Sequence, residues 1–499
     1  MSNSEKNTYY LAVDLGATSG RTVLGSFDGN RLLMRELTRF KNPIIPMNNH
    51  LFWNLPSLYY EILLSLRKVA EEGITLTAIG IDTWGCDFAL FDKDGMLSGL
   101  PYCYRDSHTE NAMDELFKRI PAKEVYQLTG IQFMPFNSIF QLDTLKRQHC
   151  QALQNARQIL FIPDALTYML TGHAVTEYTI ASTSQLINPS TGLLETKLLE
   201  AIGLTSDQFG RIVYPGETVG TLNKQARQFS GLPEIPVIAV AGHDTASAVA
   251  AVPAKDKNFA YLSCGTWSLL GIETPHPIIT EDSFLHNFTN EGGLDGTTRF
   301  LKNICGLWLL ERCREEFKDA PQDIAELTAL CETTAFDSLI NPDAPCFAHP
   351  ESMTGSIRLY CRQTGQDEPQ TPAEFCRCIF RSLALRYRQV LNLLIEMAPF
   401  SIERLHVIGG GSQNRYLMQY TANATGLPVI CGPVEGTAIG NLLVQIKACG
   451  QVRSLNDMRQ ISANSVTLKT YSPQDMETWE KAYNQFIEIQ EKEKHINLI

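Results

Sequence analysis

The sequence predicts an α/β protein made of two domains that share one plan. The chain has 499 residues, whereas a single hydrophobic core stops growing at roughly 250–300 residues. Two short segments echo each other, LAVDLGATS at 11–19 and AYLSCGTWS at 260–268, and the second begins about halfway along the chain. Strands and helices alternate between them. This order predicts α/β layers with ligand groups at the carboxyl ends of the strands.

Each of the two segments predicts a pair of strands joined by a tight turn. An apolar run reaches a polar residue, then Gly and small hydroxyl residues, and a second apolar run follows at 22–27 or at 269–272. A Gly-containing turn between two apolar runs is typical of a hairpin. The repeat is far longer than a solenoid period, so it indicates two related domains.

The segments between the hairpins predict the remaining layers. Pro56 begins an amphipathic helix that Gly73 ends, and a buried strand follows at 76–81. In the second half an apolar stripe over 375–394 predicts a helix, and further strands are expected at 237–240 and 405–408. A charged surface helix is expected at about 473–494.

Pro and Lys residues break the pattern near 253–257, so we expect an N-terminal domain at 1–253 and a C-terminal domain at 254–499.

The composition is that of a globular enzyme. Apolar residues make up 44% of the chain and charged residues 19%, and the net charge is −12. An acidic chain of this kind argues against a nucleic-acid partner and against an anionic membrane surface. The sequence holds no signal pattern and no apolar run of about 18 residues, so we expect a cytoplasmic protein. The thirteen cysteines form no C-x-x-C pair, and we expect them to be free thiols.

The first candidate for chemistry is the segment that begins with Asp14. A carboxylate ends the predicted strand, and a turn of Gly, Ser and Thr with Arg21 follows. Backbone N–H groups of such a turn can face phosphate oxygens, and Asp14 could hold Mg²⁺ as a hard oxygen ligand. A hairpin without a ligand explains the same residues. No G-x-x-x-x-G-K-[ST] motif occurs in the chain.

Two further turns offer backbone contacts to a phosphate or a nucleotide. The second hairpin turn, 263–268, contains the same small residues as the first. Three consecutive glycines at 409–411 follow the predicted strand at 405–408, where they allow close approach of a ligand or of another element. We interpret the Gly-spaced helix at 435–440 as structural.

Asp244 is the candidate general base. It lies in Gly-His-Asp-Thr at 242–245, between the strand predicted at 237–240 and an Ala-rich helix. A carboxylate at such a junction could accept the proton of a hydroxyl that attacks a phosphate. The alternative is that Asp244 or Thr245 caps the following helix, as Asp and Thr commonly do.

Other polar clusters are less informative on their own. Asp82-Thr83-Trp84-Gly85-Cys86-Asp87 ends a strand, and its Trp could face a sugar or lie in the core. We expect the clusters at 289–293 and 302–303 to be loops.

These motifs occur in one order along nearly the whole chain: VDLGATSGR, GIDTWGCDF, GLPYCYRDS, GIQFMPFNS, AGHDTASAV, LSCGTWSLLG, TNEGG, LKNICGLWLL and VIGGGSQN. In this set the chain resembles the FGGY carbohydrate kinases, and within them the members that act on L-rhamnulose. The GIDTWG, HDTASAV and GTWSL stretches carry the narrower resemblance. The resemblance implies a duplicated actin/hexokinase/Hsp70-like (ribonuclease H-like) ATPase fold with a cleft between two domains.

The resemblance also implies an activity and the residues that carry it. The activity is ATP-dependent phosphorylation of L-rhamnulose at O1 in rhamnose catabolism, with Mg²⁺ anchored by Asp14 and Asp244 as general base. It places the sugar on the N-terminal domain and the nucleotide mostly on the C-terminal one. The implied sugar-binding residues are Gly85, His243, Asp244, Thr245 and Asn303. The implied ATP-binding residues are Ala17, Thr18, Ser19, Gly20, Arg21, Thr266, Glu311 and Gly410, and Glu311 stands where an amide is expected.

Two alternatives remain at this point. One is a kinase of the same fold acting on fuculose, xylulose or glycerol, because ketose specificity depends on a few hydrogen bonds. The other is a non-catalytic sugar sensor with an ATPase fold, although neither end of the chain carries a basic DNA-binding module. A dinucleotide-dependent oxidoreductase lacks support, since no G-x-G-x-x-G follows the first strand.

Overall fold

The structure is a computed structural model that describes residues 7–318, 320–321, 323–348 and 350–495. The chain divides into two compact units. Unit 1 comprises Met1–Lys255, Glu273–Phe300 and Gly436–Val466, and unit 2 comprises Asp256–Ile272, Leu301–Glu435 and Thr467–Ile499. The chain passes from one unit to the other within strands β16 (Trp267–Thr274) and β18 (Thr298–Cys305). The ends of the two predicted domains, residues 1–6 and 496–499, lie outside the described residues.

Unit 1 is built on a six-stranded mixed sheet with the strand order β13-β14-β6-β1-β2-β3. Its central strands β1 (Thr8–Leu15), β6 (Leu76–Thr83) and β14 (Pro236–Ile238) are parallel. β2 (Ser19–Phe27) pairs antiparallel with β1, as the first hairpin motif predicts. The carboxyl ends of the three parallel strands therefore meet at one edge of the sheet.

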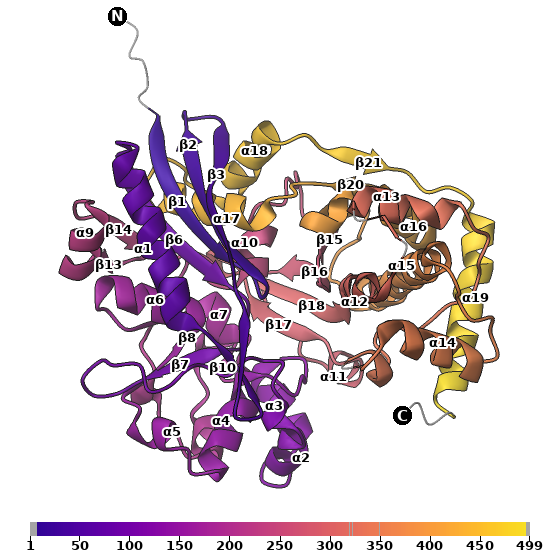
Figure 1. Ribbon diagram of the computed structural model, residues 1–499, viewed down its shortest axis with the longest axis horizontal. Helices are drawn as coiled ribbons and strands as arrows, with labels where there is room; N and C mark the ends of the chain where they lie inside the picture. The colour runs from indigo at the N-terminus through magenta and orange to yellow at the C-terminus, as the bar shows by residue number, and fades with distance from the viewer. Residues whose placement is uncertain (1–6, 319, 322, 349, 496–499) are drawn as a thin grey trace, which may run out of the picture. The chain divides into compact units, whose positions relative to one another are not determined.

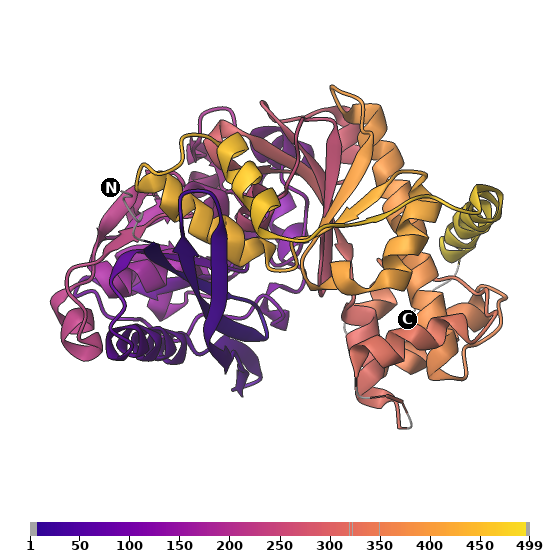
Figure 2. The same cartoon turned by 90° about the horizontal axis from the view of Figure 1, so that it is seen from above.

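Helices cover both faces of this sheet because its central strands are apolar on both sides. Leu11, Val13 and Leu15 of β1 point into one core, which includes the apolar face of α1 (Leu55–Glu71). Tyr10 and Ala12 point into the opposite core with α10 (Asp244–Ala250) and α17 (Gly436–Ala448). Figures 1 and 2 show α1 on one face of the sheet and α17 on the other.

The remaining regular elements of unit 1 complete this sheet, as β3 and β13 do at its edges, or lie outside it. Its other strands are β3 (Leu32–Lys41), β4 (Ile44–Met47), β5 (His50–Trp53), β7 (Phe88–Phe91), β8 (Gln158–Phe161), β9 (Val175–Glu177), β10 (Ile187–Asn188), β11 (Leu193–Leu194), β12 (Arg211–Val213), β13 (Thr218–Thr221) and β17 (Thr289–Gly292). Its other helices are α2 (Ala112–Phe117), α3 (Ala122–Thr129), α4 (Ser138–Arg147), α5 (Gln151–Asn155), α6 (Ile162–Thr171), α7 (Tyr178–Ser182), α8 (Thr196–Ala201), α9 (Lys224–Ser230), α11 (Glu281–Leu285) and α18 (Leu455–Ser465).

Unit 2 contains most of a seven-stranded sheet with the order β17-β18-β16-β15-β19-β20-β21. β15 (Phe259–Cys264) and β16 form the second predicted hairpin, and β15 also pairs parallel with β19 (Arg404–Ile408). β20 (Val429–Cys431) continues in parallel and β21 (Lys469–Tyr471) is antiparallel to it. The central pattern of a hairpin followed by parallel strands thus occurs in both sheets.

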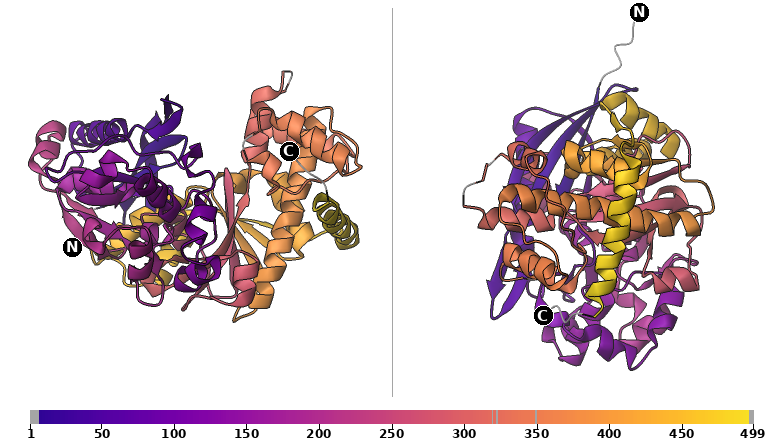
Figure 3. Two further views of the ribbon diagram at one scale, coloured as in Figure 1. Left: turned by 90° about the horizontal axis from the view of Figure 1, so that it is seen from below. Right: turned by 90° about the vertical axis from the view of Figure 1, so that its right-hand side faces the viewer.

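The helices of unit 2 are α12 (Trp308–Glu316), α13 (Ile324–Ala329), α14 (Met353–Gln363), α15 (Pro372–Met397), α16 (Arg415–Thr425) and α19 (Met476–Glu493). The charged C-terminal helix α19 contacts α15 and α16, and it is yellow in the right-hand view of Figure 3. The thirteen cysteines, all within the described residues, are thiols outside any disulfide. Within the described ranges no helix is both long and apolar enough to span a membrane.

Two local predictions are wrong, and one predicted strand is present but ends earlier than expected. Residues 289–292 and 302–303 lie in strands β17 and β18 and not in loops, because their polar side chains find partners inside the fold. The amide of Asn290, for example, donates to the carbonyl oxygens of Gly130 and Ile278 at 3.0 Å. The strand predicted at 237–240 ends at Ile238, and the chain then turns toward Asp244.

Candidate active site

The carboxyl ends of the three parallel strands of unit 1 bring Asp14, Asp82 and Asp244 to one edge of the sheet. Asp14 lies directly opposite Asp82 in the parallel register of β1 and β6. The backbone N–H of Thr83, the next residue, donates to the carbonyl oxygen of Gly242 at 2.9 Å. This contact joins the end of β6 to the segment that carries Asp244. The three aspartates therefore lie close together because of how the strands pair. Their spacing along the chain does not reveal this.

Asp14 is held by Arg21, which faces it across the first hairpin. The Nε and Nη2 atoms of Arg21 donate to Asp14 Oδ2 at 2.9 and 2.7 Å. The turn between them is short, since the N–H of Gly16 donates to the Ser19 carbonyl oxygen at 2.9 Å. Of the five residues predicted to bind ATP here, Ala17 and Thr18 lie in this turn. Ser19, Gly20 and Arg21 already belong to β2.

Asp82 is fully buried next to these charges. Its Oδ2 accepts a hydrogen bond from the Asn441 amide of α17 at 2.5 Å. Its Oδ1 is buried and has no hydrogen-bond partner among the described residues. Burial raises the pKa of Asp82 well above its usual range. The negative charge of Asp14 raises it further, whereas the Asn441 hydrogen bond lowers it.

The oxygens of Asp14 and Asp82 fit a hydrated magnesium ion. Mg²⁺ prefers oxygen ligands and usually keeps several of its waters, so one or two carboxylates hold it. The buried Oδ1 of Asp82 is an acceptor that such an ion or its water would satisfy. Within the described ranges no group of three or more His, Cys, Asp or Glu side chains is arranged to hold a metal directly.

Asp244 begins helix α10 but does not cap it. His243 occupies the N-cap position, and no side chain there accepts a capping hydrogen bond. The Oδ1 atom of Asp244 accepts instead from the Thr245 hydroxyl at 3.0 Å, and one third of the Asp244 side chain is exposed. The capping alternative for Asp244 and Thr245 is therefore wrong. The carboxylate remains accessible at the sheet edge.

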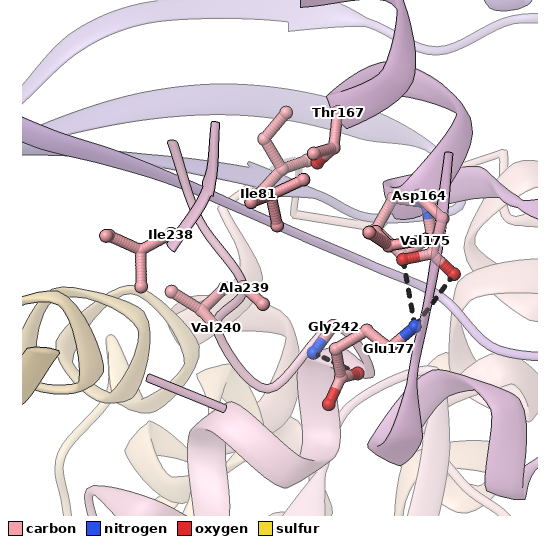
Figure 4. Close-up of a pocket in the computed structure, with 11 residues that line it drawn as sticks. Ile81, Asp164, Thr167, Val175, Glu177, Ile238, Ala239, Val240 and Gly242 are labelled. Carbon is pink, nitrogen blue, oxygen red and sulfur yellow. Dashed lines mark hydrogen bonds between the residues drawn. The ribbon is translucent and has the colours of Figure 1, made fainter. Parts of the chain in front are cut away.

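A buried glutamate, Glu177, holds the segment that leads to Asp244. Its carboxylate accepts from the backbone N–H groups of Thr179, Ile180 and Gly242 at 2.9, 3.0 and 2.9 Å. Its own backbone N–H donates to both carboxylate oxygens of Asp164, at 3.1 and 3.2 Å (Figure 4). Burial raises the pKa of both carboxyl groups.

The two acids line a cavity of about 10 Å³, which is room for about one water molecule. A β-carbon at position 242 would lie 2.8 Å from the Glu177 carboxylate, so the close contact requires Gly242.

The predicted sugar-binding residues of unit 1 cluster around the same edge. Gly85 follows β6, and a β-carbon there would lie 3.2 Å from the Thr183 hydroxyl oxygen. His243 and Thr245 are buried on either side of Asp244. Trp84 is also buried and donates to Asp87 at 3.0 Å, which favours the core interpretation of this tryptophan over a sugar contact.

The predicted nucleotide-binding residues of unit 2 also lie at one sheet edge. Thr266 is in the turn between β15 and β16, and its hydroxyl donates to Glu311 of α12 at 3.4 Å. Gly410 follows β19, the parallel neighbour of β15. No atom lies within 4 Å of a β-carbon added at Gly410, whereas Gly409 and Gly411 pack against Cys264. Two of the three glycines therefore serve packing, and the middle one is open.

The fold thus separates the predicted residues into two groups. Asp14, the turn at 17–21, Gly85 and residues 243–245 belong to unit 1. Thr266, Glu311 and Gly410 belong to unit 2, as does Asn303 of β18, which was predicted to bind sugar.

Comparison with known proteins gives the family. Residues 9–251 match the FGGY family of carbohydrate kinases, N-terminal domain, and residues 260–449 match its C-terminal domain. The chain belongs to the FGGY family of carbohydrate kinases. A rhamnulokinase of Bacteroides thetaiotaomicron is 56% identical over 96% of this chain and 98% of that protein. A rhamnulokinase of Oceanobacillus iheyensis is 40% identical over 94% and 99% of the two chains.

Solved structures show the same fold for this kinase. A gluconate kinase from Lactobacillus acidophilus matches with a TM-score of 0.82, at 16% identity over 97% of this chain and 98% of that one. A Plasmodium falciparum glycerol kinase with ADP matches with a TM-score of 0.77, at 15% identity over 97% and 98% of the two chains. The two-domain kinase fold predicted from the motifs is confirmed.

Sequence reasoning missed several residues that shape the site of the kinase. Glu177, Asp164 and Asn441 lie in segments with no motif, and only the fold brings them to the sheet edge. Glu291 falls in the polar cluster at 289–293 that the sequence predicts as a loop, and no motif contains its partner Arg299. The residues between Glu291 and Arg299 are mostly glycine, threonine and aspartate, so no local pattern marks these two as a buried pair.

Proposed function

We propose that the kinase transfers the γ-phosphoryl group of ATP to O1 of L-rhamnulose, giving L-rhamnulose 1-phosphate. The supporting observation is the high identity to proteins named rhamnulokinase over nearly the full length of both chains. We propose the roles implied by the motifs: Asp244 as general base, Asp14 with Mg²⁺, and the residue sets given above for sugar and ATP. We also propose the division at 253–254 into a sugar-binding and a nucleotide-binding domain, and a cytoplasmic location.

In this mechanism the protein supplies mainly positions and a proton acceptor. Asp244 takes the proton of the O1 hydroxyl as the bond from O1 to the γ-phosphorus forms. The bond from that phosphorus to the bridging oxygen of ADP breaks, and ADP leaves with the bond electrons. Asp14 and Asp82 would hold a hydrated Mg²⁺, which neutralises charge on the phosphate oxygens when bound. Glu177 keeps Gly242, and with it Asp244, in place.

The substrate assignment is tested by ADP release. We would measure Mg²⁺-ATP turnover with L-rhamnulose, L-fuculose, L- and D-xylulose and glycerol, together with a reaction that lacks sugar. The expected result is a kcat/KM for L-rhamnulose well above the others. A higher kcat/KM for another sugar would show that this sugar, and not L-rhamnulose, is the substrate. A folded protein that binds ATP without sugar-dependent ADP release would point to the sugar sensor.

The role of Asp244 is tested by Asp244→Asn. We expect kcat to fall by a factor of about 10²–10⁴, because a general base contributes that much, with ATP affinity and melting temperature nearly unchanged. The matched control is Asp282→Asn, an exposed aspartate in the first turn of α11, which should keep the wild-type rate. Near-full turnover in Asp244→Asn would remove Asp244 from the mechanism.

A further inference from the structure

A buried ion pair lies beside His243 and takes no part in the reaction described above. Arg299 of β18 is completely buried, and its Nη2 atom lies 3.1 Å from Glu291 Oε2 of β17. The Nε of Arg299 also donates to the Gly292 carbonyl oxygen at 2.9 Å. Burial raises the pKa of Glu291, but the charge of Arg299 and contact with His243 more than offset this, so its pKa is lowered. Both groups are therefore charged.

Such a pair is a poor source of stability. Removing two charges from water costs several kcal/mol per ion, and an apolar pair of equal volume is often as stable. The pair is better explained by what else it contacts. The Nδ1 atom of His243 lies 3.1 Å from Arg299 Nη2 and 3.2 Å from Glu291 Oε2.

The chemistry of arginine determines which atom donates in the contact between Arg299 Nη2 and His243 Nδ1. A guanidinium has donors only and stays protonated, so a hydrogen bond between it and His243 requires Nδ1 to accept. A neutral imidazole that accepts at one nitrogen carries its proton on the other. The other nitrogen, Nε2, lies 3.5 Å from Asp244 Oδ1. A chain of contacts therefore runs from Glu291 through Arg299 and His243 to the proposed base.

We propose that Arg299, held by Glu291, fixes His243 with its proton on Nε2, so that this N–H is a donor beside the Asp244 carboxylate. This inference rests on the proposed function of Asp244. The distance of 3.5 Å from His243 Nε2 to Asp244 Oδ1 is longer than an ordinary hydrogen bond. The N–H on Nε2 is therefore available to a hydroxyl of the sugar.

The proposal also assigns different roles to the two oxygens of Asp244. Oδ1 already accepts from the Thr245 hydroxyl at 3.0 Å and faces the His243 N–H. Oδ2 is then the oxygen that takes the proton from the sugar. His243, Arg299 and Glu291 act as positioning residues, and the substrate they fit presents a second oxygen beside the hydroxyl that is phosphorylated, as a ketose does.

The proton position on His243 can be measured without turnover. The protein would be labelled with ¹⁵N in its histidine rings, and His243 would be assigned among the ten histidines from the signal lost in His243→Gln. Spectra would be recorded at about pH 8.5, above the ordinary histidine range. We expect Nε2 to be protonated and Nδ1 to be unprotonated. A protonated Nδ1 in the neutral ring would overturn the proposal, since Glu291 would then be its acceptor.

The role of the ion pair in setting the His243 tautomer is tested by replacing both charged residues at once. Removing only one of them would leave the other charge buried without a partner. In Glu291→Gln/Arg299→Met we expect a mixture of both His243 tautomers and a kcat lower by roughly tenfold, with the KM for ATP unchanged. The matched control is Glu273→Gln/Arg459→Met, which removes another largely buried ion pair of unit 1. It should alter neither the tautomer nor kcat.

If the Glu291/Arg299 double variant keeps the wild-type tautomer of His243, Arg299 does not determine that tautomer. If the double variant keeps the wild-type kcat, the ion pair has no influence on Asp244. Failure of the proposed function is distinguishable from failure of this inference. If the wild type phosphorylates another sugar, the kcat values of the wild type and the variants are compared with that sugar as the substrate. If it releases no ADP, the spectra alone support or overturn the tautomer assignment.

Discussion

At the scale of single residues, Asp87 shows how burial and hydrogen bonds change the pKa of a carboxyl group. Its position in the sequence does not reveal these partners. It is fully buried below the Gly85 turn and accepts from the indole N–H groups of Trp53 and Trp84 at 2.5 and 3.0 Å. It also accepts from the backbone of Tyr104 and the amide of Gln141. Burial raises the pKa of Asp87 from 3.8 to about 6, although these donors lower it. Asp87 thus fixes two tryptophans beside the predicted sugar site.

The raised pKa of Asp87 predicts a pH-dependent contribution to stability. Between pH 4 and 6 the folded carboxyl binds a proton more readily than the unfolded one, so the free energy of unfolding decreases as pH rises. The contribution is complete below about pH 4 and is lost above about pH 6, and two pKa units correspond to about 3 kcal/mol.

Asp87→Asn does not titrate and keeps an acceptor for the indoles. We therefore expect the melting temperature of the wild type, relative to this variant, to fall from pH 4 to pH 6.5 in a calorimetric series. The exposed control Asp282→Asn should run parallel to the wild type over the same range. A constant difference between the wild type and Asp87→Asn would show that the folded Asp87 titrates near its ordinary pKa.

At the scale of elements, the crossing of α10 and α17 sets the position of the proposed base. A β-carbon on Gly440 of α17 would lie 1.7 Å from the carbonyl oxygen of Ser247 in α10. The obstacle is backbone, which no side-chain rotation can relieve. The sequence interpretation of the Gly-spaced helix as structural agrees with this contact.

Gly440→Ala is therefore expected to push α10 away from α17. We expect a loss of about 1–3 kcal/mol in stability from overpacking, and a lower kcat because Asp244 begins α10. Melting curves and ADP release measure the two effects. The control is Gly355→Ala in α14, where the nearest atom is the Ser352 hydroxyl oxygen at 3.0 Å, and it should change stability by less than about 1 kcal/mol. Wild-type behaviour of Gly440→Ala would mean that the two helices separate at no cost.

At the scale of the whole molecule, ligand binding should appear as a gain in stability. A ligand that binds only the folded state at 100 times its Kd adds about 2.7 kcal/mol. We expect Mg²⁺-ATP to raise the melting temperature, and chelation of the metal by EDTA to remove much of the gain.

Asp14→Asn should reduce the metal-dependent part of this gain more than the part seen with ATP alone, because Asp14 is proposed to hold the ion and Gly410 and Thr266 the nucleotide. Asp282→Asn again provides the unaffected control. An equal gain with and without metal in the wild type would contradict a role for Asp14 in holding the ion.

The sequence by itself determined the family, the two hairpins, the principal strands and helices, and the position of Asp244 after a strand. These follow from local patterns: apolar periodicity, Gly and Pro at element ends, and motifs whose residues are adjacent in the chain. The same patterns predict loops at 289–293 and 302–303, whereas 289–292 and 302–303 lie in strands, because the partners of their polar side chains lie far away in the chain.

Only the tertiary structure decided which distant side chains meet. The pairing of Asp14 with Asp82 depends on strand register, and the support of Gly242 by Glu177 joins residues 65 positions apart. The contact of Arg299 with His243 spans 56 positions. Buried charges must find partners at short range, since low-dielectric surroundings make isolated ones costly, and the partner is chosen by packing in three dimensions. Local sequence therefore fixed the elements and the chemistry they carry, whereas the fold selected the neighbours that control it.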